Sequence, residues 1–516
     1  MTGELTRRRL AAGAILLGAV PAAVASAADV GRWKRAESRR FIVYSDGSDW
    51  ELRATVEKLE QFDWTLRQVH GLDPKAAPSR KLDIYLVQSE TDLRRSDPSI
   101  SDNTGGFYSA GTGNIFAIMI RQNISSSSRH GTADSWSETI IFHEYTHHFM
   151  FQYFPFPYPT WLVEGWAEYF GVTTIDGPNI EVGGFDAGIV RSLQFDAWLP
   201  LETLLGKSLA QISADDWLMF YAQAWLLTHY MQGNATRRRQ LVAYTDDVAR
   251  GSDPVSAMTR ASGMSLAELT KALRAYVHGA IPYIKLVQPP ESIAPNSLQV
   301  TPLPKSADAL LLDSVRVCHG RVDAKAAPAL LASLRKSADR FPGDRLAQLT
   351  LARAEVDFGD RAQGQAMLAR WLAANPDDVE ALELAAKSRL DAAAKDPDHA
   401  HALALEAQPL LGRAYKLDTE RYQTLWSYVR SRRYLDATYP SNNTLEALLK
   451  ALELAPQVGQ LRYEAARALL LRGRYADATG ILAPMLNDPH GQDTAEVRKL
   501  QAQIDEAAKA AAAGKP

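Results

Sequence analysis

The chain is short of cysteine, and this excludes several kinds of metal and redox site. Among its 516 residues only Cys318 is a cysteine, so no intramolecular disulfide can form. Zinc clusters built from several thiolates, and the cysteine pair that attaches a c-type haem, are excluded for the same reason. Any transition-metal site must therefore be built from histidine and carboxylate side chains. We expect Cys318 to be a packed thiol beside a surface imidazole, His319.

The sequence also lacks an excess of charge and a long apolar run. Its formal net charge is -3, whereas a general nucleic-acid binder needs a clear basic excess, so we expect no nucleic-acid partner. Beyond the N-terminus no segment has the roughly 18 uncharged apolar residues that suggest a membrane-spanning helix. We therefore expect no stable membrane span and a soluble mature protein. The length predicts two or three domains.

Residues 1–27 are typical of a signal peptide. Three arginines, Arg7 to Arg9, precede the apolar run from Leu10 to Val20, and the small residues Ala25 to Ala27 are suited to cleavage. The arginines are also similar to those of a twin-arginine signal, with an ordinary secretory signal as the alternative. We expect a periplasmic or secreted protein.

Residues 28–134 predict a small α/β subdomain. A helical apolar periodicity runs from Leu52 to Val69. Segments with the alternation of half-buried strands, the last two forming a hairpin, are Phe41–Tyr44, Leu82–Val87, Gly105–Tyr108 and Asn114–Ile120.

Three further regions follow. Residues 135–287 are mainly helical in pattern, and residues 288–307 are rich in proline, which predicts an extended linker. Residues 308–512 predict tetratricopeptide-like helical repeats, because Pro342 and Pro376 are 34 residues apart and Pro456 and Pro489 are 33 apart. A generic helical bundle is the alternative. Such repeats form a surface suited to a peptide or protein partner.

The most informative motif is the pentapeptide from His143 to His147, in which Glu144 follows the first histidine. Side chains four residues apart on a helix lie one above the other, so both imidazoles can face one metal ion. Glu144 is turned round the helix and can reach a water on that ion without being a ligand. Ser135 to Glu138 is similar to a capping box, which predicts that a helix begins there. Two histidines on an ordinary helix face are the alternative.

A second helical stretch carries Glu164 and Glu168. Hydrolytic zinc sites have three protein ligands and one position for water, and two histidines with one glutamate are a standard set. Glu164 would complete this set, and Glu168 would accept the free ring N–H of a ligating histidine. The alternative is a solvated helix face, which the flanking aromatic residues disfavour because buried unpaired carboxylates are costly.

The two stretches, HEYTH and WLVEGWAEYF, resemble those of the gluzincin metallopeptidases, which include bacterial collagenases and the aminopeptidase N group. The resemblance is most specific from Ser135 to Gly171. It implies one Zn²⁺ held by His143, His147 and Glu164, with Glu144 as the catalytic base. It also implies an α+β gluzincin peptidase domain, with a small mixed sheet and a helical subdomain. The repeat pattern adds an all-α tetratricopeptide-like solenoid after that domain.

Other site residues are candidates for binding the reacting groups. The tetrahedral oxyanion needs a donor besides zinc, and Tyr221, His229 and Tyr230 lie downstream of the third ligand as the resemblance implies. We expect His148 either to lie on the surface or to contact a ligand without binding the metal itself. An extended substrate is expected to pair with an edge strand; the residues expected there are Asn114, Ile115 and Phe116, with Gly105 and Gly106 leaving room.

The sequence thus favours an exported zinc peptidase acting on peptides or proteins. The spacer between the two motifs is shorter than in aminopeptidases and their exopeptidase motif is missing, which favours an endopeptidase. The alternatives are a catalytically inactive zinc-binding scaffold that acts through its repeats, and a hydrolase of non-peptide amides.

Overall fold

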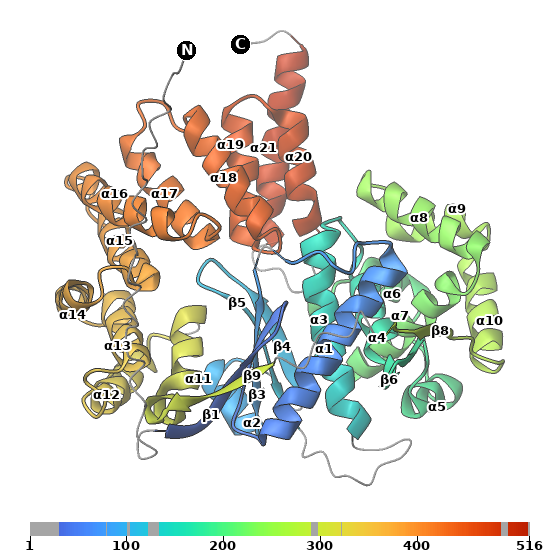
Figure 1. The fold of residues 1–516 in the computed structure, drawn as a ribbon. Coiled ribbons are helices and arrows are strands. Elements are labelled where there is room, and N and C mark those ends of the chain that lie inside the picture. The colour runs from blue at the N-terminus through green and yellow to red at the C-terminus, as the bar shows by residue number, and fades with distance from the viewer. Residues whose placement is uncertain are drawn as a thin grey trace, which may run out of the picture.

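The computed structural model describes residues 30–78, 80–100, 104–121, 134–289, 298–320, 322–486 and 494–513. The predicted signal peptide lies outside these residues, and so do the side chains of Ser135, Trp136 and Ser137 in the predicted capping box. The helix expected to begin there starts at Asp134, and the Glu138 side chain forms an ion pair with Lys58. The fold is mixed α/β, with a small sheet and many helices (Figure 1). Within the described ranges, no helix is long and apolar enough to cross a membrane.

The main sheet has six strands in the order β4-β5-β3-β2-β1-β9. β2, β3 and β5 are parallel, and the other strands pair antiparallel with their neighbours. The strands are β1 (Val30–Glu37), β2 (Phe41–Ser45), β3 (Leu82–Val87), β4 (Gly106–Ala110), β5 (Ile115–Ile120) and β9 (Gln299–Pro304).

The prediction that Asn114 to Ile120 form an edge strand is wrong. β5 pairs with β3 on one side and β4 on the other, so its backbone groups are used within the sheet. The edge strand next to the helix that carries His143 and His147 is β4 instead. The reason is topological, because the tight hairpin turn folds β4 outward while β5 joins the parallel strands.

Each face of this sheet is covered by helices (Figure 1). On one face pack α1 (Asp49–His70) and α3 (Asp134–Tyr153), which share a core with Val43, Ile84 and Ala117. On the other face pack α2 (Glu90–Ser96) and α11 (Lys305–His319), which share a core with Tyr85 and Phe116. Covering both faces buries β3 and β5 almost completely, as parallel strands require.

A mainly helical unit follows α3. Its first helix, α4 (Thr160–Gly171), contacts both α3 and α7 (Trp217–Gln232). A small antiparallel sheet is formed by β6 (Thr174–Asp176), β7 (Asn179–Val182) and β8 (Ile284–Val287). The remaining helices are α5 (Ala187–Phe195), α6 (Leu201–Gly206), α8 (Ala235–Ala249), α9 (Pro254–Ser262), α10 (Leu266–Val277) and the 3-10 turns Leu209–Gln211 and Ala214–Asp216.

The proline-rich segment is not simply a linker. Residues 290–297 are outside the described part, but β9 pairs antiparallel with β1 and α11 begins at Lys305. Pro302 and Pro304 are tolerated in β9 because it is the outer strand, where a missing backbone N–H need not break the ladder. This strand and α11 tie the C-terminal helices to the main sheet.

The C-terminal helices follow one another in contacting pairs. Among them, α11, α13, α15, α17 and α19 contribute residues to a cavity of about 680 Å³ that the main sheet also lines. The helices after α11 are α12 (Ala327–Ala338), α13 (Arg345–Phe358), α14 (Arg361–Ala374), α15 (Val379–Ala393), α16 (Ala400–Leu417), α17 (Tyr422–Leu435), α18 (Asn442–Leu454), α19 (Gly459–Leu471), α20 (Tyr475–Leu482), the 3-10 turn Ala483–Met485 and α21 (Thr494–Ala512).

Candidate metal centre

Two histidines of α3 face the same point. His143 and His147 are one helical turn apart, and their Nε2 atoms are 3.1 Å apart. His147 is 1% exposed, so the surrounding side chains limit the motion of its ring. The helical spacing of the motif is therefore realised with both imidazoles directed the same way.

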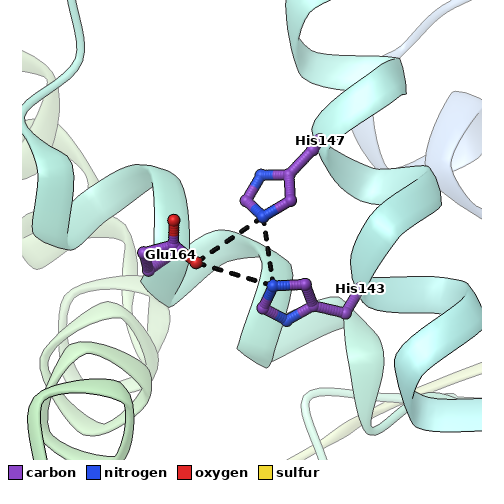
Figure 2. A group of neighbouring side chains, drawn as sticks. All are labelled: His143, His147 and Glu164. Atoms are coloured by element: carbon purple, nitrogen blue, oxygen red, sulfur yellow. Dashed lines mark hydrogen bonds and ion pairs between the residues drawn. The ribbon is translucent and has the colours of Figure 1, made fainter. Parts of the chain in front are cut away.

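The third group comes from α4. The Oε2 atom of Glu164 lies 3.5 Å from Nε2 of His143 and 3.6 Å from Nε2 of His147. Figure 2 shows the carboxylate and the two imidazoles pointing toward one another across the space between the helices. Glu164 has no exposed surface, and a carboxylate at such a position requires positive charge nearby.

The spacing of these atoms fits a small divalent ion. Zinc bonds to nitrogen and oxygen are about 2.0–2.2 Å long, so two ligand atoms of a tetrahedral site are separated by roughly 3.3–3.5 Å. The three observed separations of 3.1, 3.5 and 3.6 Å lie close to that value. His143, His147 and Glu164 are also the one group of metal-ligating side chains of this kind found in the described residues.

Glu168 holds the far side of one imidazole. Its Oε1 atom lies 3.1 Å from Nδ1 of His143, while Nε2 of the same ring faces Glu164. Burial opposes protonation of this imidazole, but hydrogen bonds to Glu164 and Glu168 outweigh burial and raise the pKa of His143 well above its usual value. The two carboxylates thus favour positive charge between them, which a protonated His143 supplies.

Glu144 and Tyr221 lie beside this cluster. The ring centroid of Tyr221, on α7, is 6.2 Å from that of His143. Burial, together with the charges of Glu164, Glu168 and Glu144, raises the pKa of Tyr221 far above its usual value. The phenol therefore stays protonated and remains a hydrogen-bond donor. Glu144 is half-buried, and its charge contributes to this shift.

His229 does not join the cluster. Its Nε2 atom lies 2.8 Å from the carbonyl oxygen of Gly183 and its Nδ1 atom 2.9 Å from the Tyr276 hydroxyl. It is also two turns along α7 from Tyr221, roughly 12 Å. Burial lowers the pKa of His229, and the Gly183 hydrogen bond only partly opposes this effect. We therefore assign His229 to the core rather than to the reacting groups, and Tyr230, which packs on Tyr276, is likewise placed there.

The predicted substrate residues are distributed differently from the expectation. Ile115 and Phe116 are buried on opposite faces of the sheet, and Asn114 bonds to Arg80 and Asp83. Gly106 leaves no free space, because a Cβ atom there would lie 2.8 Å from Cβ of Met119. The carbonyl oxygen of Gly105 accepts a hydrogen bond from Ile120. Gly106 thus allows close packing inside the subdomain, and residues 114–116 do not form an open edge.

One contact beside the motif could not be read from the sequence. His148 is 8% exposed, and its Nδ1 atom lies 3.2 Å from the hydroxyl of Tyr108 on β4. Burial lowers the pKa of His148 to about 3, so this imidazole is neutral. His148 is therefore not a surface residue, and it links α3 to the edge strand.

A buried ion network fixes the rotation of α3 from its other side. The hydroxyl of Tyr145 donates a 2.7 Å hydrogen bond to Asp63 of α1, and Arg40 and Arg67 each lie 2.7 Å from the same carboxylate. Asp63 is fully buried. Its place among the apolar positions of the predicted helix 52–69 is the one sequence signal for this network.

Comparisons with protein-family models, with curated proteins and with solved structures found no match.

Proposed function

We propose that the protein is a zinc-dependent peptidase that cleaves peptide bonds within polypeptide chains. The observation that carries the proposal is the convergence of His143, His147 and Glu164 from two helices at ligand-like separations. The two histidines and a glutamate are a standard ligand set of catalytic zinc. The resemblance to gluzincins supports the same reading, and with it an α+β peptidase domain followed by tetratricopeptide-like repeats.

The residues around the ligands would divide the chemistry between them. A bound zinc ion would supply Lewis acidity, which makes water a better nucleophile at neutral pH and polarises a carbonyl group. Glu144 would accept the proton of the attacking water and deliver it to the leaving nitrogen. The Tyr221 hydroxyl would donate a hydrogen bond to the oxygen that becomes negatively charged. Glu168 would keep the His143 ring in place.

The substrate would lie along β4, the observed edge strand. Gly105 and Gly111, which flank this strand, both form backbone hydrogen bonds within the β4–β5 hairpin. Because residues of an antiparallel pair alternate between bonded and non-bonded positions, Gly106, Tyr108 and Ala110 direct their backbone groups away from β5. An extended peptide can add to such an edge by main-chain hydrogen bonds.

The N-terminal pattern supports export to the periplasm or beyond, where a protein or peptide substrate would be met. The repeats would add a surface for a protein partner. Fractionation of cells tests the proposed export, and affinity capture tests the proposed protein partner.

The test measures metal content and hydrolysis in the same preparations. Zinc per chain and hydrolysis of casein and gelatin, with and without chelator, are compared for the wild type, Glu164→Ala and Glu144→Gln, with the exposed Glu202→Gln as control. We expect one zinc per chain in all but Glu164→Ala, and activity only in the wild type and the control. A wild type without stoichiometric zinc, or full activity in Glu144→Gln, would overturn the proposal. Cleavage of small amides but no peptide would favour a non-peptide amidohydrolase.

A further inference from the structure

Strand β4 is the outer strand of the main sheet and has a neighbouring strand on one side only among the described residues. It is five residues long, pairs only with β5 among the described strands, and all of its residues are half-buried. Short edge strands of this kind open locally more easily than central strands do. A strand that aligns a substrate must nevertheless stay in place relative to the metal ligands, so the contacts that hold β4 are of interest.

One side chain of β4 points to the metal-site helix. The Tyr108 hydroxyl lies 3.2 Å from Nδ1 of His148, the residue after the ligand His147. The two rings are also in edge-to-face contact, with centroids 5.5 Å apart. This contact sets the separation between β4 and α3 on one face of the sheet.

The next side chain of β4 points to the opposite face, where α11 ends. The Ser109 hydroxyl lies 3.1 Å from Nδ1 of His319, and Nε2 of that ring lies 3.4 Å from Asp97. The imidazole also packs edge-on against Phe116 of β5. His319 is therefore not the surface imidazole that the sequence suggested, and it joins the C-terminal helices to the edge strand.

The turn that follows β4 is held by α17. The Tyr422 hydroxyl donates a 2.8 Å hydrogen bond to the carbonyl oxygen of Gly111, and the Gln423 amide donates a 3.3 Å bond to that of Gly113. Both bonds join residues more than 300 positions apart. Figure 1 shows the β4–β5 hairpin reaching toward α17.

The turn fits this position tightly. A Cβ atom on Gly113 would lie 2.4 Å from the carbonyl oxygen of Cys318, at the end of α11. The Arg80 guanidinium lies over the Tyr422 ring, 5.6 Å from its centroid, and donates a 2.7 Å hydrogen bond to Asn114. Two C-terminal helices, α11 and α17, and the loop that carries Arg80 thus contact the turn.

We propose that the C-terminal helices hold the edge strand beside the metal centre, with Tyr422 and His319 as positioning residues for substrate binding. The role in substrate binding rests on the proposed function, whereas the stabilisation of β4 by the C-terminal helices does not. The C-terminal helices would then be part of the peptidase unit, because they add to the support that β5 and α3 give to β4.

The test uses the full chain and a double variant, Tyr422→Phe with Gln423→Leu, which removes both hydrogen bonds to the turn but keeps most of the packing. The exposed Tyr415→Phe on α16 is the matched control. We expect amide hydrogen exchange in residues 104–121 to become at least about fivefold faster in the double variant, as loss of one hydrogen bond or more implies. Exchange in α3 and zinc content should not change.

A second measurement tests whether the stabilisation of β4 by the C-terminal helices affects substrate binding. We expect KM for casein to rise about fivefold or more with kcat within about twofold, because the affected strand binds substrate but carries no reacting group. Unchanged amide hydrogen exchange in residues 104–121 would show that the C-terminal helices do not stabilise β4, whether or not the protein is active. Faster exchange with unchanged KM would overturn the positioning role. A wild type that cleaves no peptide would count against the proposed function. The exchange result would still show whether the C-terminal helices stabilise β4.

Discussion

The Oε1 atom of Glu168 lies 3.1 Å from Nδ1 of His143, on the side of the ring opposite the Nε2 atom that faces Glu164. One turn of α4 would therefore supply both a ligand to the proposed metal and an acceptor for a ligating histidine. Such an acceptor would fix which nitrogen of His143 carries the proton and would leave the other free to bind a metal.

Replacing Glu168 by Gln should weaken metal binding without abolishing it. Loss of the carboxylate removes the charged acceptor at Nδ1 of His143, and changes of this kind lower metal affinity by about 10- to 100-fold. Competition with a chromophoric zinc chelator measures the affinity. The exposed Glu202→Gln should bind zinc as the wild type does, and an equal affinity in Glu168→Gln would remove Glu168 from the site.

Replacing Tyr221 by Phe should lower kcat with little effect on KM. The hydroxyl is proposed to bind the oxygen that gains charge in the transition state, and removal of one such donor costs about 10²- to 10³-fold. Steady-state kinetics on casein or a cleaved peptide gives both constants.

Tyr230→Phe is the matched control, because this residue is on the same helix but packs on Arg237 and Tyr276. Its kcat should stay within about twofold of the wild-type value. Should the Tyr221 variant keep wild-type kcat, the oxyanion would have to be bound by another group.

The sequence predicts what is local in this site and misses what depends on distant pairing. His143, His147 and Glu144 follow from a five-residue motif on one helix, and Glu164 from a second helix close by in the chain. The position of β4 outside β5 depends on which strand joins β3, a choice that the hairpin pattern itself does not specify. Likewise β9 could not be predicted from the sequence, because its prolines are as typical of a linker as of an edge strand.

His229→Gln should make the protein less sensitive to acid. Burial holds the pKa of His229 below its unfolded value of about 6.5, so the unfolded chain binds the proton more readily. The stability that this neutral imidazole contributes is present above about pH 6.5 and is lost as the pH falls toward the folded pKa. Glutamine can still donate to Gly183 and does not titrate.

Urea denaturation at pH 7.5, 6.5 and 5.5 with chelator present tests this expectation. The loss of unfolding free energy from pH 6.5 to 5.5 should be smaller in His229→Gln than in the wild type, by at most about 1.4 kcal/mol. The exposed His278→Gln should follow the wild type. Equal slopes for all three proteins would mean that His229 titrates normally.

Replacing Gly165 by Ala should destabilise the protein through the contact between α4 and α7. A Cβ atom on Gly165 would lie 2.3 Å from Oγ1 of Thr228 and 2.5 Å from the carbonyl oxygen of Ala224. Both atoms belong to α7, which carries Tyr221, and the carbonyl cannot turn aside without moving the helix. Such overpacking costs about 1–3 kcal/mol, and thermal unfolding of the zinc-free protein measures it.

Gly412→Ala gives the opposite expectation with the same chemical change. Gly412 lies within α16, and nothing would touch an added Cβ atom there. Alanine in a helix interior is more stable than glycine by about 0.5–1 kcal/mol, so this variant should unfold at the wild-type temperature or above. Because Gly165 is next to Glu164, Gly165→Ala should also bind zinc more weakly than the wild type, whereas Gly412→Ala should bind zinc as the wild type does. Wild-type stability and zinc affinity in Gly165→Ala would show that the two helices can separate without disturbing the ligands.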